Sequence, residues 1–452
     1  MKKFFTYPVF VVLFFSFIGM MGFGAIVKYH YDGGKRFQFL QKPVTLIAEI
    51  PINFRKLIKF GTIDLNKIMI LSKSTKHKDK KRFQKYLEKK RNALLILPRY
   101  DNDISRAVID IIDLNNFDII HTYKHDINQM YKLISNNDEL QKIKRFLDSK
   151  NKFLYAHPIL LKDGSIISGS HYSIRFKIDF CSNLQWINDE EIFHHSQMID
   201  HEGNIWMGGQ MNPKSKYIKK YSIKNYEDDS IIKLSTDGKI LFNKSVTEIL
   251  VENNIQLDNF ALTSSLSNIL DPIHLNDIEP AFSDTDYWEQ GDVFISIRQL
   301  SAIIHYRPNT NKVINYIRGP FVQQHDVDII SDKEISIFNN NNFFVDNEYS
   351  EVLIYNFETK KFRKLFNDQL QKEKFKTISE GLSHIFSDGS LMVEEQNHGR
   401  IILFNNQGKK EWEFVNKDNK GYVTYVSWSR IIEDEQFIRN FKSLVKNKKC
   451  LN

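Results

Sequence analysis

Short apolar runs alternate with polar turns along most of the chain. In six segments, a run rich in branched and aromatic residues ends in a turn of Asn, Asp, Gly or Thr, and a second such run follows. This pattern predicts two strands joined by a tight turn. The six predicted hairpins are residues 108–123, 174–187, 231–242, 303–317, 352–366 and 401–414.

A second pair of strands precedes each hairpin after the first, as in residues 157–169 and 325–339. Two hairpins per unit form a four-stranded blade, so six units predict an all-β fold, a six-bladed β-propeller over residues 92–435. The first unit lacks its inner strand. We expect residues 422–432 to supply it, because closure of the ring protects two sheet edges.

Histidines stand at the start of several predicted inner strands. Their distance to the following turn is nearly constant in three units, which indicates a structural repeat. Because the innermost strand of a blade begins beside the central channel, we expect these side chains to surround one channel mouth. The residues are His157, His195, His274, His325 and His384.

Arg298 ends the apolar run at residues 293–297, in the same unit as His274. A buried guanidinium needs an anionic partner. That partner is either a carboxylate of a neighbouring blade or the anionic group of a substrate, and the sequence leaves both interpretations open.

Clustered histidines could instead hold a metal ion, since three imidazoles bind zinc with an open position. Asp326 follows His325 directly, but strand alternation turns its side chain to the opposite face. We therefore predict no metal ion. The chain also lacks a phosphate-cradling glycine motif and a His-Glu-x-x-His helix, and we predict no cofactor.

Four stretches of the chain resemble the bacterial arylsulfate sulfotransferase family. They are FHHSQMIDHEGNIW at His195, IHLNDIEP at His274, GDVFISIRQLSAIIHYRP at Arg298 and VQQHDVDIISDKEISIFNNN at His325. The resemblance implies a six-bladed propeller enzyme that transfers a sulfuryl group from an aryl sulfate to a phenol without a nucleotide donor. The expected substrates are therefore small aryl sulfates and phenols.

The resemblance also implies a role for each residue of this set. His325 would be the nucleophile that forms a sulfohistidine, and His274 and Arg298 would contact the sulfuryl oxygens. His195 would assist them or act as acid and base for the phenols. We choose His195 over the adjacent His194 because of its spacing to the next turn, and we expect structural roles for the two remaining histidines of the repeat.

Residues 4–27 form an uncharged apolar stretch near the N-terminus. At ~1.5 Å per helical residue it can cross a ~30 Å hydrocarbon core. It is a membrane helix or a signal sequence, and its length favours an uncleaved anchor over residues 1–30. We expect a single-pass protein of the inner membrane with the propeller in the periplasm, a placement that rests on the implied function because the flanking charges are balanced.

The net charge of +8 is concentrated in residues 73–91, within a predicted basic linker over residues 31–91. The linker is either solvated or attracted to anionic lipid headgroups. Because the remaining chain shows no basic face, we expect no nucleic-acid binding. A basic tail, residues 436–452, follows the propeller. Cys181 and Cys450 provide no disulfide framework, although a bridge between them is possible.

Two alternatives to the sulfotransferase remain. One is a propeller that binds or senses a ligand without turnover, and the other is a metal-dependent hydrolase or lyase that uses the same histidines. The presence of His195, His274, Arg298 and His325 together favours the enzyme, because a binding module has little need of a nucleophilic histidine beside an arginine.

Overall fold

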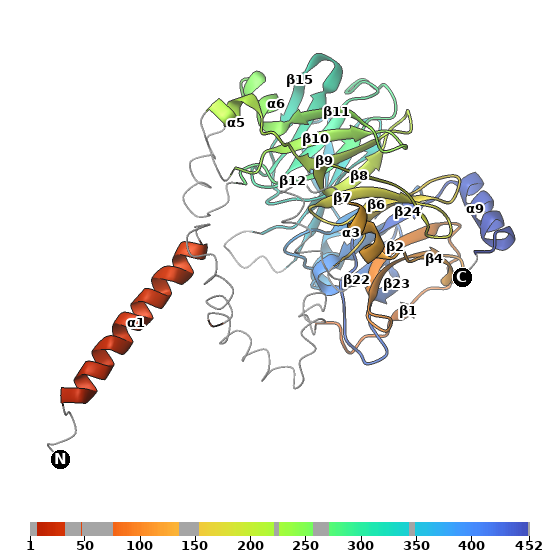
Figure 1. The fold of residues 1–452 in the computed structure, drawn as a ribbon. Helices are drawn as coiled ribbons and strands as arrows, with labels where there is room; N and C mark the ends of the chain where they lie inside the picture. Colours follow the sequence, from red (N-terminus) through yellow and green to blue (C-terminus); the bar gives the residue numbers. More distant parts are fainter. Residues whose placement is uncertain are drawn as a thin grey trace. The chain divides into compact units, whose positions relative to one another are not determined.

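The computed structural model of the chain describes residues 7–31, 47, 76–134, 153–220, 226–255, 271–342 and 349–450. The chain divides into two compact units, Met1–Ile68 and Met69–Asn452. The described part of the first unit holds the long helix α1, and that of the second holds a series of antiparallel sheets (Figure 1).

Helix α1 spans Tyr7–Tyr31. Its segment Val11–Tyr29 is long and apolar enough to cross a membrane, and most of its large apolar side chains are exposed. A signal sequence near an N-terminus has the same properties. The structure therefore confirms one apolar helix that is either a membrane span or a signal sequence.

The second unit contains three sheets of four strands. The first is β24 (Arg430–Ile432), β2 (Leu94–Asp101), β3 (Arg106–Asp113) and β4 (Asp118–Tyr123). The second is β12 (Leu275–Pro280), β13 (Val293–Ile297), β14 (Ala302–Arg307) and β15 (Lys312–Ile317). The third is β16 (Val327–Ser331), β17 (Glu334–Asn339), β18 (Glu351–Asn356) and β19 (Lys361–Leu365).

Two sheets are larger. One has five strands, β1 (Phe83–Lys85), β23 (Lys410–Val415), β22 (Arg400–Phe404), β21 (Leu391–Glu395) and β20 (Leu382–Ile385). The other has seven, β11 (Ile240–Ser245), β10 (Asp229–Leu234), β9 (Ile205–Gln210), β8 (Leu184–Ile199), β7 (Ser173–Ile178), β6 (Ile166–Gly169) and β5 (Ala156–Leu160).

The all-β, propeller-like arrangement is confirmed, but the predicted count of six separate blades is not. Four sheets have the four- or five-stranded form of a blade, and the remaining strands share the seven-stranded sheet. The physical reason is β8, which continues from an outer strand into an inner one. Its first part pairs with β7 and its second part with β9, so no turn separates the second predicted unit from the third.

Buried apolar clusters fill the junctions between successive groups of strands. Ile109 and Phe176 belong to a cluster that joins β2–β4 to β5–β7, and Phe294 and Ile337 belong to one that joins β13 to β17. Another cluster joins the first strands to the last sheet. Strand β24 pairs with β2, as predicted for the C-terminal strand, so the two ends of the series meet.

Short helices connect or cover these sheets. Helix α9 (Glu435–Asn447) is amphipathic and packs Ile438 and Phe441 into the cluster beneath it, so most of the predicted basic tail is a docked helix. The other short helical segments are α3 (Ile127–Leu133), α5 (Lys216–Lys220), α6 (Val246–Glu252), α8 (Asn367–Lys372) and the 3₁₀ turns Pro308–Thr310 and Gln396–His398.

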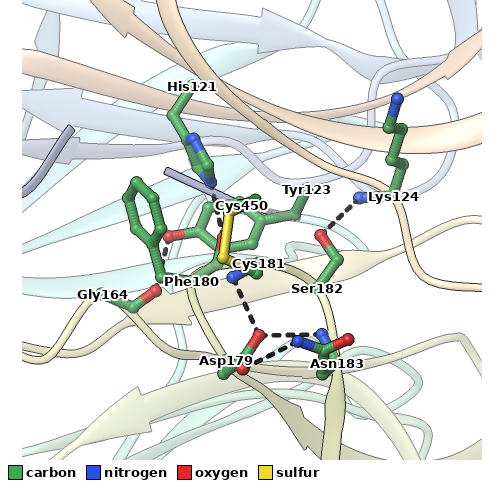
Figure 2. The surroundings of a disulfide bond; sticks show 10 residues. All are labelled: His121, Tyr123, Lys124, Gly164, Asp179, Phe180, Cys181, Ser182, Asn183 and Cys450. Atoms are coloured by element: carbon green, nitrogen blue, oxygen red, sulfur yellow. Dashed lines mark hydrogen bonds between the residues drawn. A yellow bond between two sulfur atoms is a disulfide. The ribbon is translucent and has the colours of Figure 1, made fainter. Parts of the chain in front are cut away.

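A disulfide joins Cys181, in the turn between β7 and β8, to Cys450 just beyond α9 (Figure 2). The Cys181 turn is fixed by Asp179, whose Oδ1 accepts the backbone N–H of Cys181 at 2.8 Å. Beside the bridge, the rings of His121 and Phe180 stack with centroids 4.0 Å apart. The bridge that the sequence left open therefore fastens the C-terminal segment to the sheets.

Residues 76–91 pack against the five-stranded sheet, so this part of the predicted linker is not a solvated chain. Strand β1 pairs with β23, and Arg91 donates two hydrogen bonds to Glu411 at 2.7 and 2.8 Å. Nearby basic side chains surround two buried carboxylates in what we name the Arg400 cluster. Its members are Lys76, His77, Lys80, Glu395, Arg400 and Glu413.

Candidate active site

The backbone takes an unusual conformation where the chain enters the inner strands β5, β8, β12, β16, β20 and β24. A non-glycine residue at each entry has a φ angle between 40° and 57°. This left-handed region costs about 1–3 kcal/mol and persists only where surrounding contacts hold it, often at functional sites. The residues are His157, His195, His274, Gln323, Glu380 and Trp428.

This repeated position corrects the predicted register of the histidines. Three of the predicted histidines occupy it, but Gln323 and Glu380 stand there in the next two units. His325 lies two residues further along the chain, and His384 lies four. The distance to the next turn did not reveal this difference, because the left-handed residue is not at a constant distance from the inner strand: His157 lies within β5, whereas Gln323 lies four residues before β16.

His195 lies at the centre of a group of aromatic rings. Its ring centroid is 5.1 Å from that of His274 and 6.5 Å from that of His325. The ring centroid of Trp428 is 5.7 Å away. Residues from four sheets, or from the loops that enter them, therefore converge at one place, as expected for a channel mouth.

Arg298 lies in the same place. Its backbone N–H donates to the carbonyl oxygen of His274 at 3.0 Å, and its Nη2 donates to Oε1 of Gln323 at 3.1 Å. The buried Nε has no hydrogen-bond partner among the residues that the structure describes. Burial lowers the pKa of Arg298. A guanidinium with an unused donor favours the interpretation in which an anionic ligand binds here.

The hydrogen bonds of His325 define its tautomer. The backbone N–H of Glu380 donates to Nε2 at 2.8 Å, so Nε2 carries a lone pair and Nδ1 carries the proton. Nδ1 then donates to Oδ1 of Asn340 at 2.6 Å. Burial, followed by the charges of Arg298 and His274, holds the pKa of His325 well below its usual value. His325 is therefore a neutral imidazole near pH 7.

His274 is oriented by Asp271, three residues earlier. One carboxylate oxygen of Asp271 accepts the backbone N–H of His274 at 3.0 Å, and the other lies 2.5 Å from Nδ1. Burial raises the pKa of Asp271, but the hydrogen bonds with His274 and the charges of His274 and His194 together outweigh burial, and the net pKa is lowered. The charged carboxylate therefore directs a proton to Nδ1, as in other carboxylate–histidine pairs.

His194 and His195 contact each other and face different surroundings. Their Nδ1 atoms are 2.7 Å apart, so only one of the two carries a proton there. His194 lies 3.4 Å from a carboxylate oxygen of Asp229 and packs near Tyr172, whereas His195 faces the other histidines. Burial and the neighbouring imidazoles hold the pKa of His195 well below its usual value.

The comparison with known families agrees with this geometry. The family model described as arylsulfotransferase (ASST) matches residues 157–417, more than half of the chain. The chain belongs to the arylsulfotransferase family. The matched range includes all the site residues named so far except Trp428. The search of curated proteins found no significant match.

Solved structures similar to this arylsulfotransferase-family chain are distant. One is a protein of unknown function from Bacteroides caccae, with 11% identity and a TM-score of 0.45, and it covers 74% of this chain and 97% of that one. Another is virginiamycin B lyase from Staphylococcus aureus, with 10% identity and a TM-score of 0.33, covering 57% of this chain and 69% of that one. Neither supports an argument about activity.

Several site residues of this arylsulfotransferase-family chain escaped the sequence analysis. Asn340 follows β17, Glu380 precedes β20, and His171 lies in the loop between β6 and β7. His171 Nε2 is 3.1 Å from Oε1 of Glu380, within ion-pair distance but not aligned as a hydrogen bond. No periodic pattern singles out these loop positions. The NNN run that ends the His325 motif was the one available signal, for Asn340.

Buried carboxylates line the inner strands that lead away from the histidines. Burial raises the pKa of Asp277 to about 6 and that of Asp328 to about 7, and it raises those of Glu279 and Asp326 further. Asp277 accepts the backbone N–H of Val327 at 2.9 Å, so such carboxylates connect neighbouring inner strands.

Asp326 borders the same narrow pocket as His325, and its Oδ2 accepts the backbone N–H of Ser383 at 3.0 Å. Within the described ranges, no group of three or more His, Cys, Asp or Glu side chains is arranged to hold a metal ion. His157 lines the same narrow pocket as His325 and Trp428, whereas His384 lies apart, 3.7 Å from Glu433.

Proposed function

We propose that this chain is a sulfotransferase that moves a sulfuryl group from an aryl sulfate to a phenol through a sulfohistidine at His325. The observation that carries the proposal is the state of His325, which is buried, neutral and protonated at Nδ1. The lone pair of Nε2 is the nucleophile that such a reaction needs. The family of the chain supports the same activity.

In the first half of the reaction, Nε2 of His325 attacks the sulfur and the bond from sulfur to the aryl oxygen breaks. Negative charge spreads over the sulfuryl oxygens in the transition state, much as in phosphoryl transfer. Arg298, with its unused Nε donor, and His274 are placed to stabilise that charge. In the second half a phenol oxygen attacks the same sulfur and releases His325.

The donor must first displace the Glu380 N–H from Nε2 of His325, because that bond occupies the attacking lone pair. Gly381, which follows Glu380, has a φ of 94°, a backbone conformation that favours glycine. We assign His195 a supporting role beside the sulfuryl group, since its ring lies between those of His274 and His325.

We also propose that the seven-stranded sheet represents two blades that share β8, which gives six blades in all. Two features support this count. Six buried apolar clusters fill the junctions between successive strand groups of the described residues, and six left-handed residues mark the entries to the inner strands. The propeller then covers residues 92–435, as the hairpin pattern predicts.

For the location, we propose an anchor over residues 1–30 in the inner membrane, a linker over 31–91 whose last part is docked, and the propeller in the periplasm. The Cys181–Cys450 bridge supports this placement, because disulfides form and persist in oxidising compartments. The apolar helix α1 supports the anchor.

The test is to incubate the purified full chain in detergent with 4-nitrophenyl sulfate, with and without phenol and a chelator. We expect phenol-dependent release of nitrophenol that survives the chelator and disappears in His325→Ala, with His384→Ala as the matched control. An absence of transfer from many different aryl sulfates would favour a propeller that binds a ligand without turnover. Loss of activity with the chelator would favour a metal-dependent enzyme.

A further inference from the structure

Transfer between phenols requires a proton carrier in addition to a nucleophile. The phenolate that leaves the donor is a strong base when its phenol has a pKa near 10, and the acceptor phenol must lose its proton as it attacks. An acid–base residue must therefore reach the phenol oxygen, on the side of the sulfur opposite to His325, and must have a means to stabilise its own charge.

His195 is poorly suited to this task. It is 5% exposed, and its Nδ1 faces a second imidazole. Three further histidines lie nearby, and they disfavour an added positive charge on His195. No carboxylate lies within ion-pair distance of His195 among the described residues.

His171 has the contacts that His195 lacks. Its side chain is 24% exposed, and its Nε2 lies 3.1 Å from the carboxylate oxygen Oε1 of Glu380. Its ring centroid is 5.1 Å from that of His195 and 5.0 Å from that of Trp428. His171 therefore borders the histidine group and Trp428, and a carboxylate beside it can balance the charge of a bound proton.

Glu380 links the proton carrier to the nucleophile. Its backbone N–H donates to Nε2 of His325, while its side chain lies against His171. The loop that carries it is held by Asn340, whose Nδ2 donates to the carbonyl oxygen of Glu380 at 2.7 Å. Asn397 accepts the backbone N–H groups of Ile378 and Ser379 in the same loop. One held residue thus contacts both chemical groups.

We infer that His171 exchanges the proton with the phenol oxygen and that Glu380 positions it, an inference that rests on the proposed sulfuryl transfer. As the bond between sulfur and the aryl oxygen breaks, protonated His171 gives its proton to that oxygen, and a neutral phenol leaves. In the second half the acceptor phenol gives its proton to His171 as its oxygen bonds to sulfur and the bond from sulfur to His325 breaks. The cycle consumes no net proton.

The test is the dependence of rate on the leaving group, which a structural role would not alter. For wild type and His171→Gln, kcat/KM is measured with a series of aryl sulfates from 4-nitrophenyl to phenyl to 4-methylphenyl. We expect His171→Gln to lower kcat/KM roughly 10²–10⁴-fold for phenyl sulfate, the usual effect of losing general acid catalysis. With 4-nitrophenyl sulfate, whose phenolate needs little protonation, the loss should be under about 10-fold.

Two further variants keep the experiment decisive. Glu380→Gln retains the backbone N–H that contacts His325 but lacks the carboxylate charge. We expect kcat/KM of this variant to depend more steeply on the pKa of the leaving phenol than in wild type, but less steeply than in His171→Gln. If His171→Gln does not fold, Glu380→Gln takes its place in the test. His384→Gln removes a histidine that also pairs with a glutamate, but away from the site, and should match wild type with every donor.

An active wild type whose variants lose the same factor with every donor, or lose nothing, would overturn the role of His171 and leave sulfuryl transfer intact. A wild type that transfers from no aryl sulfate would overturn the proposed function and this role with it.

Discussion

The chain buries two groups of charged and titratable side chains, and they are balanced in opposite ways. In the Arg400 cluster, Arg400 donates to Glu395 at 2.6 Å and to Glu413 at 3.1 Å. Burial alone would raise the pKa of both carboxylates. The hydrogen bond from Lys80 and the charge of Arg400 instead hold the pKa of Glu413 at about 2, and the hydrogen bond with His77 and the charge of Arg400 lower the pKa of Glu395. In the histidine site, Arg298 keeps an unpartnered donor, and burial keeps His325 neutral.

We interpret the Arg400 cluster as structural and propose the histidine site as functional. Each carboxylate of the Arg400 cluster has its cations, so the cluster is complete without a ligand and holds residues 76–91 on the sheet. In the histidine site the Nε donor of Arg298 has no hydrogen-bond partner among the described residues, although the carboxylate of Asp271 lies close enough to interact with its charge. An unpartnered buried donor among titratable side chains therefore supports the proposal of a ligand site.

The largest expected effect is the loss of transfer in His325→Ala. Removal of a covalent nucleophile should lower kcat by roughly 10⁴-fold or more, and rapid quenching of wild type with an aryl sulfate should show a sulfuryl group on a peptide that contains His325. A labelled peptide from another part of the chain would assign the nucleophile elsewhere.

The second prediction concerns stability at the balanced cluster. Arg400→Met should lower the free energy of unfolding by about 3–5 kcal/mol, because it removes the buried cation that Glu395 and Glu413 share. Urea unfolding measures the loss, and a transfer assay well below the melting temperature should show unchanged activity per folded molecule. If Arg400→Met folds but is inactive, the Arg400 cluster contributes to transfer and its role is not only structural.

The third prediction is the opposite result at Arg298 in the histidine site, a loss of activity without a loss of stability. Arg298→Met should lower kcat by roughly 10²–10³-fold, as the loss of a transition-state donor does, and should leave the melting temperature unchanged or raised. Arg298→Lys should recover part of the activity, since it keeps the charge without the planar fork. A destabilisation as large as that of Arg400→Met would show that Arg298 has a structural partner.

The smallest effect is a pH dependence of stability from the buried carboxylates of the inner strands. Burial raises the folded-state pKa of Asp328 to about 7, above its unfolded value of ~3.9. The folded state therefore holds the proton more tightly, and Asp328 destabilises the fold increasingly as pH rises from about 4 to 7.

Asp328→Asn cannot ionise, so it should be more stable than wild type by about 1–2 kcal/mol at pH 8 and equal to it at pH 4. Thermal unfolding at both pH values is the measurement. The Arg400 cluster should behave oppositely, because the depressed pKa of Glu413 gives stability above pH ~4 that is lost as pH falls toward 2. If Asp328→Asn were stabilised equally at both pH values, the charge of Asp328 would not be the cause of the difference in stability.

Much of this molecule could be predicted from local pattern. Hairpins depend on strand-forming runs and turn residues that are adjacent in the chain, so the strands of the sheets appeared at their expected places. The set His195, His274, Arg298 and His325 lies within recognisable motifs, and the structure brings these four side chains together. The roles assigned to them stay predictions.

Other features depended on neighbours that local pattern does not specify. The continuous β8 replaced a turn between two predicted units, because its residues can pair on both sides. The sequence around residues 73–91 resembled a solvated linker because nothing nearby in the chain pairs with its basic side chains. In its described part, these side chains contact carboxylates that lie about three hundred residues later in the chain.

The sequence by itself determined an all-β chain of repeated hairpins, an apolar N-terminal helix and one family-specific set of polar residues. Only the tertiary structure decided that Glu380 contacts both His171 and His325, and that Cys181 meets Cys450 across 269 positions. The physical reason is closure. When the first and last strands pair, loops far apart in sequence arrive at one channel mouth, and their contacts follow from the geometry of the closed sheets.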